Sequence, residues 1–365
     1  MKRRTFLQSG IAVALGSRLH AHYDQNKLQA AATILACATK SGQIESSSLY
    51  VQQGDRVFAE TFGKAEATDA MFLLASISKT ISIATVMTLF DEGLFRLEDP
   101  VQNFIPEFQK EGREKITMRH LMTHVSGLPD QLPENAKLRS QHTPLSGFVD
   151  AAIRTPLLFS PGARYSYSSM AILLATEIAR RISGKSIAEL TQERIYGPLK
   201  MTRSAMGLGT FKLSDVILNQ VEQAAPESGA GDPTTKSWDW NSPYWRKLGA
   251  PWGAAHGSAK DLATFLNEFL THTGTILKPE TSRMMVANHN PKGIRPRGLG
   301  FDLGKIGETP HLSPDTYGHT GSTGTICWVD PQIKSLCIVL TTLPSRSVSP
   351  HPRDLVSAQV AEAVR

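Results

Sequence analysis

The sequence is poor in cysteine, and this excludes two common kinds of structural reinforcement. It has 3 cysteines among 365 residues, and an odd number cannot all pair within one chain. Cys327 and Cys337 fall on consecutive predicted strands joined by a four-residue turn, so their side chains should face opposite sides of a sheet. Cys37 lies inside a helical pattern. We therefore expect three buried thiols, with no disulfide framework and no cysteine-based metal site.

A strong charge of one sign is also missing. The formal net charge is +6, but residues 1–21 contribute four basic residues and no acidic residue. The remaining residues hold 35 basic and 33 acidic side chains, which nearly cancel. Hydrophobic residues make up 41% of the chain, which is enough for a sizeable core. The composition therefore predicts a globular protein whose partners do not include nucleic acid or an anionic membrane surface.

Long hydrophobic runs are absent as well, so no segment is predicted to span a membrane. Near the start of the chain, Arg3 and Arg4 precede a short apolar core at residues 11–15. Paired arginines with bulky apolar residues just behind them are typical of a twin-arginine export signal. We predict that residues 1–21 form such a signal and that the protein is periplasmic or extracellular. A basic N-terminal anchor is the alternative.

The two ends of the chain contain most of the strand patterns, and the middle contains mainly short helical ones. Apolar runs bounded by turn residues predict antiparallel strands at residues 49–52, 57–59, 298–302, 324–329 and 335–341. Helical spacing of apolar residues occurs at residues 24–40, 169–181, 259–270 and 353–364.

These patterns predict an α/β (α+β) fold in which an antiparallel sheet is flanked by helices. Residues 24–95 and 259–365 would form this α/β lobe together, and residues 96–258 would form an inserted all-helical lobe. The polar stretch at residues 225–253 carries four of the five tryptophans, including Trp238 and Trp240. Long loops this rich in aromatic residues are often functional. We expect this loop to rim an apolar acyl pocket; packing at the lobe junction alone is the alternative.

Ser76 and Lys79 stand three residues apart at the start of a helical pattern that ends at Gly93. Residues with this spacing lie on one face of a helix, so the lysine amine can reach the serine hydroxyl. Provided that partial burial keeps the amine neutral, the amine can take the hydroxyl proton. The unpaired N–H groups of a first helical turn can in addition donate to an oxyanion. The spacing is therefore that of an activated serine nucleophile, although a Ser-x-x-Lys match alone is common.

Three further segments follow the Ser-x-x-Lys motif of Ser76 and Lys79 in order. They are residues 118–129, a Pro-Gly lead-in with tyrosines at residues 161–175, and a glycine-rich strand at residues 317–324. Together, the four motifs resemble those of the serine β-lactamase and penicillin-binding superfamily, on its class C, esterase and D-peptidase branch. The resemblance extends from about residue 43 to 342. It implies a serine hydrolase that works through an acyl-enzyme and needs no cofactor.

The resemblance also implies roles for individual residues. Ser76 matches the acylated nucleophile, Lys79 its lysine partner, and Tyr167 the tyrosine of the Tyr-x-Asn motif. The backbone N–H groups of Ser76 and Ser322 would form the oxyanion hole. Whether Lys79 or Tyr167 takes the first proton stays open, because such a pair titrates as a unit.

Substrate contacts are implied for Ser169, His319, Thr320 and Gly321. Two of these residues depart from the family pattern, since Ser169 stands where Asn is frequent and His319 stands where β-lactamases carry Lys. A histidine is mostly neutral at pH 7 and would hold a substrate carboxylate less firmly than lysine. We therefore expect hydrolysis of small esters. A D-amino-acid peptidase, a β-lactamase and a non-catalytic binding or sensing domain are the alternatives.

Two histidines require a separate interpretation. His120 and His124 are four residues apart on a predicted helix, which is a spacing used by zinc ligands. The glutamate of the His-Glu-x-x-His motif is replaced by Leu121, and no third ligand is evident. We therefore predict no metal site and expect both histidines to serve packing and capping.

Overall fold

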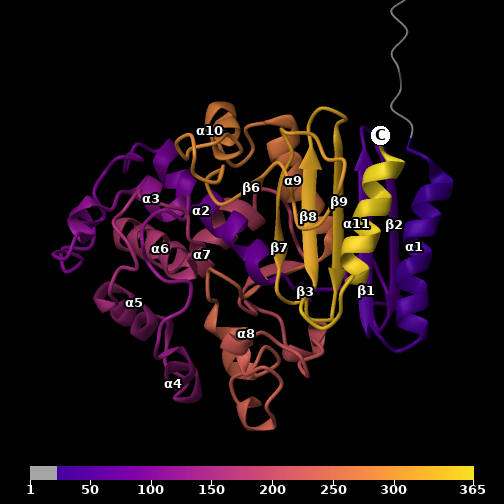
Figure 1. Ribbon diagram of the computed structural model, residues 1–365, viewed down its shortest axis with the longest axis horizontal. Helices are drawn as coiled ribbons and strands as arrows, with labels where there is room; N and C mark the ends of the chain where they lie inside the picture. The colour runs from indigo at the N-terminus through magenta and orange to yellow at the C-terminus, as the bar shows by residue number, and fades with distance from the viewer. Residues whose placement is uncertain (1–22) are drawn as a thin grey trace, which may run out of the picture.

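One antiparallel sheet forms the centre of the protein (Figure 1). The computed structural model describes residues 23–365, so the predicted export signal lies outside the described residues. The sheet has six strands in the order β2-β1-β9-β8-β7-β6. Their bounds are β1 (Ser46–Gln53), β2 (Arg56–Gly63), β6 (Asp302–Leu303), β7 (Tyr317–Gly321), β8 (Thr325–Asp330) and β9 (Ser335–Thr341).

The strands come from both ends of the chain, which confirms the predicted sheet. β1 and β2 form the expected hairpin, in which Gln53 pairs with Arg56. β1 also pairs with β9, from Ser47 opposite Thr341 to Gln53 opposite Ser335. The first and last parts of the chain therefore meet at the centre of one sheet.

Side chains of β8 and β9 alternate between the two faces of the sheet. Trp328 is paired with Cys337, and both belong to the hydrophobic cluster on one face. Cys327 is paired with Ile338, and both belong to the larger cluster on the other face. This confirms that the two cysteines face opposite sides, and both are buried free thiols.

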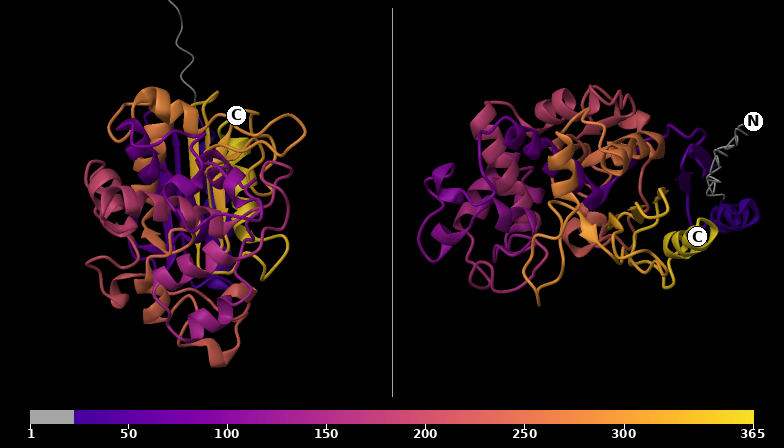
Figure 2. Two further views of the ribbon diagram at one scale, coloured as in Figure 1. Left: turned by 90° about the vertical axis from the view of Figure 1, so that its left-hand side faces the viewer. Right: turned by 90° about the horizontal axis from the view of Figure 1, so that it is seen from above.

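Helices α1 (Gln25–Lys40) and α11 (Pro352–Ala363) lie next to each other on one face of the sheet (Figures 1 and 2). The backbone N–H of Asp24 donates to the carbonyl oxygen of Ala363 at 2.8 Å, which joins their ends. Cys37 is exposed, so the prediction that it is buried was wrong. The buried side of α1 is formed by other residues, including Leu28 and Leu35, and the thiol lies away from them.

The opposite face is covered by α2 (Ser78–Asp91) and α9 (Ala259–Thr271). Every residue of α2 from Ser78 to Leu89 is buried. A helix that is enclosed on all sides needs small or apolar residues all round, and α2 consists largely of Ile, Val, Ala, Ser and Thr. The buried lysine near its start, Lys79, is the exception that requires a functional reason.

The middle of the chain has mainly short helices as its regular structure, separated by turns and loops. It contains α3 (Met118–Met122), α4 (Asn135–Ser140), α5 (Leu145–Arg154), α6 (Ser169–Ser183), α7 (Ile187–Thr191) and α8 (Pro243–Leu248), and α10 (Pro279–Met285) follows later. Two short strands in this segment, β4 (Ser204–Met206) and β5 (Ala255–Gly257), were not expected. With β3 (Phe72–Leu73) they form a second sheet in the order β3-β5-β4, which connects the segment before α2 to the middle of the chain.

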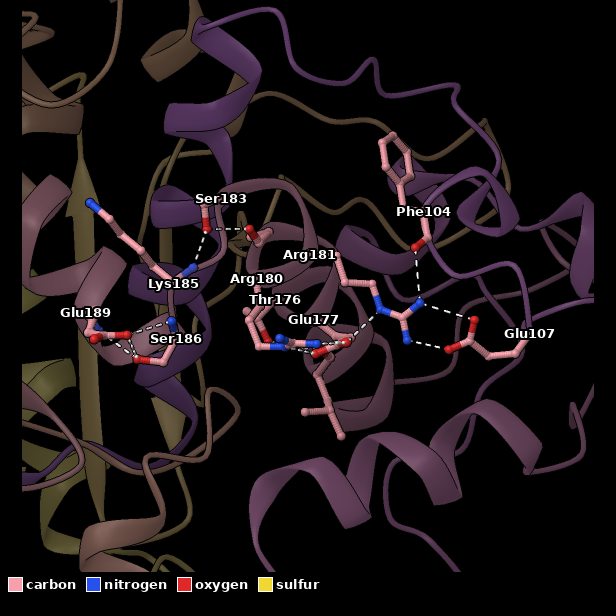
Figure 3. A network of polar contacts seen from close by, with 12 residues as sticks. Phe104, Glu107, Thr176, Glu177, Arg180, Arg181, Ser183, Lys185, Ser186 and Glu189 are labelled. Carbon is pink, nitrogen blue, oxygen red and sulfur yellow. Dashed lines mark hydrogen bonds and ion pairs between the residues drawn. The ribbon is translucent and has the colours of Figure 1, made fainter.

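A network of charged groups fixes the C-terminal half of α6 (Figure 3). The carboxylate of Glu177 accepts hydrogen bonds from Arg180 and from Arg181, each with a shortest distance of 2.7 Å. Arg181 also donates to the carboxylate of Glu107 and to the carbonyl oxygen of Phe104. Because α6 begins two residues after Tyr167, holding this helix also holds the segment that carries the tyrosine.

The predicted strand at residues 298–302 was wrong over most of its length. Strand β6 contains only Asp302 and Leu303, because the chain turns between Gly298 and Phe301. At Gly300, φ is +81°, and a Cβ would lie 3.0 Å from the Cβ of Ile83 in α2. Close packing on α2 therefore requires the glycine.

Among residues 23–365, no helix combines the length and the apolar character needed to cross a membrane.

Candidate active site

The candidate nucleophile lies in a short turn that leads into the buried helix α2. Ser76 is the middle residue of η1 (Ala75–Ile77), a 3-10 turn that continues directly into α2. Ala75 has a φ of 47°, in the left-handed region that residues other than glycine rarely adopt. Such a conformation persists only where the surroundings fix it. Ser76 is partly exposed, whereas Ala75 and Ile77 are buried.

Two threonines hold the backbone before Ser76 in this conformation. The Oγ1 of Thr323 donates to the carbonyl oxygen of Leu73 at 2.9 Å. The Oγ1 of Thr325 donates to the carbonyl oxygen of Leu74 at 3.0 Å. All four residues are buried, so these hydrogen bonds are costly to break. They hold the turn between β7 and β8 against the segment just before the nucleophile.

Gly321 allows this close approach. A Cβ at this position would lie 2.7 Å from the carbonyl oxygen of Leu74 and 3.1 Å from the Cβ of Ala75. The next residue, Ser322, lines the same cavity as Ser76. The structure thus brings together the two residues whose backbone N–H groups are the predicted oxyanion hole.

Lys79 lies within hydrogen-bond distance of the nucleophile. Its Nζ is 2.9 Å from the Oγ of Ser76 and 2.8 Å from the carbonyl oxygen of Trp252. The residue is only 1% exposed. Burial lowers the pKa of Lys79 to about 7, and the carboxylate of Asp130 partly opposes this shift. A substantial fraction of the amine is therefore neutral near pH 7 and can accept the serine proton.

Tyr167 completes the predicted group of three. Its ring centroid lies 4.7 Å from the Nζ of Lys79, and its side chain lines the same cavity as Ser76. Burial raises the pKa of Tyr167 well above its ordinary value of 10, and the guanidinium of Arg297 partly opposes this. The phenol is therefore protonated near pH 7, so of the two candidate bases the amine is the one in the accepting state.

A histidine that the sequence assigned to packing holds Tyr167 from one side. The ring centroids of His124 and Tyr167 are 4.6 Å apart. The Nδ1 of His124 accepts a hydrogen bond of 3.1 Å from the backbone N–H of Ser168, the residue after the tyrosine. His124 has a φ of 61° and lies beyond the end of α3, so its predicted helical position was wrong. The histidine fixes both the ring and the backbone of the tyrosine segment.

His319 lies on the predicted strand, in β7, and its ring contacts other groups of the protein. Its Nδ1 is 2.7 Å from the carbonyl oxygen of Thr320, and its Nε2 is 3.0 Å from a nitrogen of Arg297. Because a guanidinium only donates, Nε2 must accept and Nδ1 must carry the hydrogen. Burial lowers the pKa of His319 to about 3, so the ring is neutral. Neither His319, Thr320 nor Gly321 is among the residues that line the cavity next to Ser76.

Arg297 is a component of the site that sequence reasoning missed. Its side chain is fully buried, forms an ion pair with Asp302, and lies 5.8 Å from the ring centroid of Tyr167. Removing a partner from such a pair would leave an uncompensated buried charge. The cation therefore provides a fixed positive field beside the phenol. No spacing in the sequence pointed to it, because Tyr167 and His319, its neighbours in the site, come from separate segments.

A cavity of about 170 Å³ opens beside the nucleophile, bounded by Ser76, Tyr167, Ser169 and Ser322 among other residues. The Oγ and the backbone N–H of Ser169 donate to the Oδ1 of Asp130 at 2.6 and 2.9 Å. The position at which the resemblance implied a substrate contact is thus occupied by a serine that supports a carboxylate.

The tryptophans of the loop at residues 225–253 divide into two groups. Trp240, Trp245 and Trp252 line the cavity, whereas Trp238 does not. All four are buried. Trp240 therefore lies in the wall of a pocket, as the predicted role of this loop requires, and Trp238 does not.

The histidine pair offers no metal site in the part of the chain that the structure describes. His120 forms a capping box with Thr117 at the start of α3, in agreement with the predicted capping role. No group of three or more potential His, Cys, Asp or Glu ligands occurs among residues 23–365.

Comparisons with known proteins agree with this geometry. A family model described as Beta-lactamase matches residues 31–362. One relative, named "Putative D-alanyl-D-alanine carboxypeptidase" from Escherichia coli (strain K12), is 25% identical over 310 residues, which cover 77% of this chain and 71% of that protein.

Two solved structures share the fold. The D-amino acid amidase from Ochrobactrum anthropi SV3, crystallised with L-phenylalanine, aligns with a TM-score of 0.75 at 21% identity and covers 93% of this chain and 99% of its own. A family VIII carboxylesterase aligns with a TM-score of 0.75 at 20% identity and covers 94% and 99%. The family match includes all four motifs and nearly the whole described chain, and the chain therefore belongs to the beta-lactamase family of serine hydrolases.

Proposed function

We propose that this protein hydrolyses small esters through an acyl-enzyme on Ser76. The observation that carries the proposal is the 2.9 Å contact between the Ser76 hydroxyl and the buried amine of Lys79, at the wall of a small cavity. A nucleophile with an adjacent base is the usual arrangement for covalent acyl transfer. A binding domain without catalysis would have no need for a lysine that is 1% exposed.

The chemistry follows from the protonation states. The neutral amine of Lys79 accepts the hydroxyl proton while the Oγ of Ser76 forms a bond to the ester carbonyl carbon. The backbone N–H groups of Ser76 and Ser322 donate to the resulting oxyanion. When the ester C–O bond breaks, the phenol of Tyr167 gives its proton to the departing alkoxide and regains one from the Lys79 ammonium. Water then cleaves the acyl-enzyme, which releases the acid and restores Ser76.

The substrate class is proposed from the charges around the site. A D-peptidase or a β-lactamase has to hold a substrate carboxylate, but His319 is neutral and lies outside the cavity lining. The guanidinium of Arg139 does line the cavity, yet it already donates to Asn135 and Ser228 and stacks on Trp245. An ester needs no such clamp. The carboxylesterase with the same fold is consistent with this choice.

The proposal includes export of the protein. Its support is the twin-arginine pattern at Arg3 and Arg4, followed by a short apolar core. Fractionation of cells that produce the full chain should place the mature protein outside the cytoplasm, and replacement of both arginines by lysine should retain it inside.

Covalent labelling tests the proposed nucleophile. A fluorophosphonate reacts with activated serine hydroxyls, so the native protein should gain one adduct, on the peptide that contains Ser76. Intact-mass measurement followed by peptide mapping reads this out. Background labelling by the fluorophosphonate is controlled with heat-denatured protein, which has no activated serine. An adduct on another serine, or none on the folded protein, would contradict the assignment.

The cavity predicts a preference for short acyl chains. Its volume of about 170 Å³ is below the roughly 300–1,000 Å³ of pockets that enclose drug-sized ligands. The kcat/KM for 4-nitrophenyl esters should fall at least about tenfold from butyrate to decanoate, which corresponds to about 1.4 kcal/mol.

Two tryptophans of the same loop provide a matched pair of variants for this test. Trp240→Phe widens the cavity and should lessen the preference for short chains, whereas Trp238→Phe changes a tryptophan outside the lining and should retain it. Equal effects of the two substitutions would assign the tryptophans to general packing.

A further inference from the structure

The turn between β7 and β8 carries one of the two proposed oxyanion donors, the backbone N–H of Ser322. This N–H donates no hydrogen bond to any group of residues 23–365, and Ser322 lines the cavity beside Ser76. Such a donor stabilises a transition state only if it already points to the place where the negative charge develops. The orientation of the Ser322 N–H therefore has to be fixed before a substrate binds.

Arg353 fixes the peptide plane that contains this N–H. The plane also contains the carbonyl group of Gly321, and in a trans peptide the carbonyl and the N–H point in opposite directions. The Nη1 of Arg353 donates to the carbonyl oxygen of Gly321 at 3.1 Å. Because the guanidinium holds one end of the plane, a rotation that turned the Ser322 N–H away from the cavity would break this hydrogen bond.

The same nitrogen joins both ends of the turn. The Nη1 of Arg353 also donates to the carbonyl oxygen of Thr325 at 3.2 Å. Gly321 and Thr325 stand opposite each other as the pair of β7 and β8 next to the turn. Arg353 is only 7% exposed, so both hydrogen bonds are shielded from water. Hydrogen bonds from an ionised donor are roughly twice as strong as those between neutral groups.

The guanidinium is itself held from its other side. The carboxylate of Asp354 accepts hydrogen bonds from its Nε at 3.0 Å and from its Nη2 at 3.4 Å. The Nδ1 of His351 accepts from the backbone N–H of Arg353 at 3.0 Å, and burial lowers the pKa of His351 to about 4. The ring is therefore neutral near pH 7, and its Nε2 donates to the carbonyl oxygen of Leu343 at 3.2 Å. These contacts fix the start of α11 and with it the direction of Nη1.

Other groups hold the rest of the turn. The backbone N–H of Ser345 donates to the carbonyl oxygen of Ser322, and the Oγ1 of Thr341 donates to that of Gly324, both at 2.9 Å. Neither of these carbonyl groups shares a peptide plane with the N–H of Ser322. Among residues 23–365, Arg353 is the only side chain that donates to the carbonyl oxygen of Gly321.

We propose that Arg353 is a positioning residue of the oxyanion hole, which clamps the peptide between Gly321 and Ser322 so that its N–H faces the developing oxyanion. This inference rests on the proposed function, since it assigns the group that prepares one of the two donors. Arg353 does not line the cavity and stands at the start of α11, on the face of the sheet opposite to α2. Its loss should therefore affect the transition state more than the bound ester.

The variant Arg353→Met tests the clamp, because it keeps an unbranched stem and removes both hydrogen bonds to the turn. The kcat/KM for 4-nitrophenyl butyrate should fall at least about tenfold, since loss of one oxyanion donor typically costs about 10²–10³. In the Ser76→Ala background, which cannot react, the Kd of ethyl butyrate should change by less than about threefold. Thermal unfolding would confirm that the variant is folded.

Propylboronic acid reports on the oxyanion hole without turnover. Its boron forms a bond to the Oγ of Ser76, the hydroxyl proton passes to Lys79, and a boron-bound oxygen takes the place of the oxyanion. Its inhibition constant should rise in Arg353→Met by the same factor by which kcat/KM falls. Arg353→Lys keeps a cationic donor and should restore part of both values. Arg283→Met, at an exposed arginine of α10, is the matched control and should leave both unchanged.

The outcomes separate the inference from the proposed function. If folded Arg353→Met binds the boronic acid as well as the wild type, the inference is overturned and the esterase proposal stands. If ethyl butyrate binding is lost to the same extent as kcat/KM, Arg353 serves general packing and the inference is equally overturned.

Two further results remain decisive. If Arg353→Met does not fold, Arg353→Lys decides, because the shorter lysine cannot keep both the ion pair with Asp354 and the contacts with the turn. Its kcat/KM and boronic acid affinity should then fall together by at least about threefold, and wild-type values would overturn the inference. If the wild type cleaves no ester, the proposed function fails, and the boronic acid affinities alone decide the role of Arg353.

Discussion

Replacing Ser76 by alanine is expected to lower kcat/KM for 4-nitrophenyl butyrate by at least about 10⁴-fold. The substitution removes the only atom that forms a bond to the acyl group in the proposed reaction. It leaves the cavity and both oxyanion N–H groups in place, so substrate binding should survive. Initial rates at low substrate concentration, together with thermal unfolding to confirm the fold, would measure the effect.

Ser140 offers a suitable control for this experiment. It is an exposed serine at the end of α4, and its hydroxyl donates to a neighbouring carbonyl oxygen. Ser140→Ala should retain the full rate. If Ser76→Ala and Ser140→Ala hydrolyse the ester equally well, the reaction does not pass through an acyl-enzyme on Ser76.

Lys79→Met is expected to lower kcat by at least about 10³-fold, which is the second large effect. General acid–base catalysis typically contributes a factor of 10² to 10⁴ to the rate. Methionine fits a buried, unbranched side chain, but it has no amine to accept the hydroxyl proton. It also removes the contacts of Nζ with Ser76 and with the carbonyl oxygen of Trp252. Stopped-flow measurement of the acylation burst would locate the loss in the first chemical step. Lys260→Met, at an exposed lysine of α9, is the matched control.

The same lysine determines the pH dependence. Because the neutral amine is the active form and burial lowers the pKa of Lys79 to about 7, kcat/KM should rise with pH through a midpoint near 7. Below that pH the ammonium cannot accept a proton, and the rate falls. The residual rate of Lys79→Met should lack this step. A wild-type profile that decreases from pH 6 to 8 would exclude the amine as the base.

The residues proposed to carry the chemistry were predictable because they occur in ordered motifs. Ser76 and Lys79 are neighbours on one turn, and Tyr167 follows a Pro-Gly lead-in. Asp130 and Arg297 were not predictable, since each reaches the site only through tertiary folding and lies in no periodic pattern. For His319 the motif indicated the correct strand, but the burial that keeps the ring neutral and the contact with Arg297 both arise from tertiary folding.

The elements of the fold were likewise predictable where local sequence determines them, and not where contacts between distant segments do. Strands β8 and β9 were predicted closely, because their apolar runs are bounded by clear turn residues. The segment at residues 298–302 also contains apolar residues, but two of its five residues are glycines, and contact of Gly300 with α2 bends it. Cys37 lies in a correctly predicted helix, but its exposure depends on how α1 is rotated against the sheet. The helical spacing of the apolar residues indicated this rotation only in part.

The pairing of β1 with β9 affects how the chain matures during synthesis. Ser47 is made roughly 290 residues before its partner Thr341, and at about 5–20 residues per second this interval lasts on the order of 15–60 s. Throughout it, the nascent β1–β2 hairpin presents an open edge that other chains can join. Productive folding therefore depends on keeping this early hairpin apart from its neighbours until the ribosome has delivered the last strand.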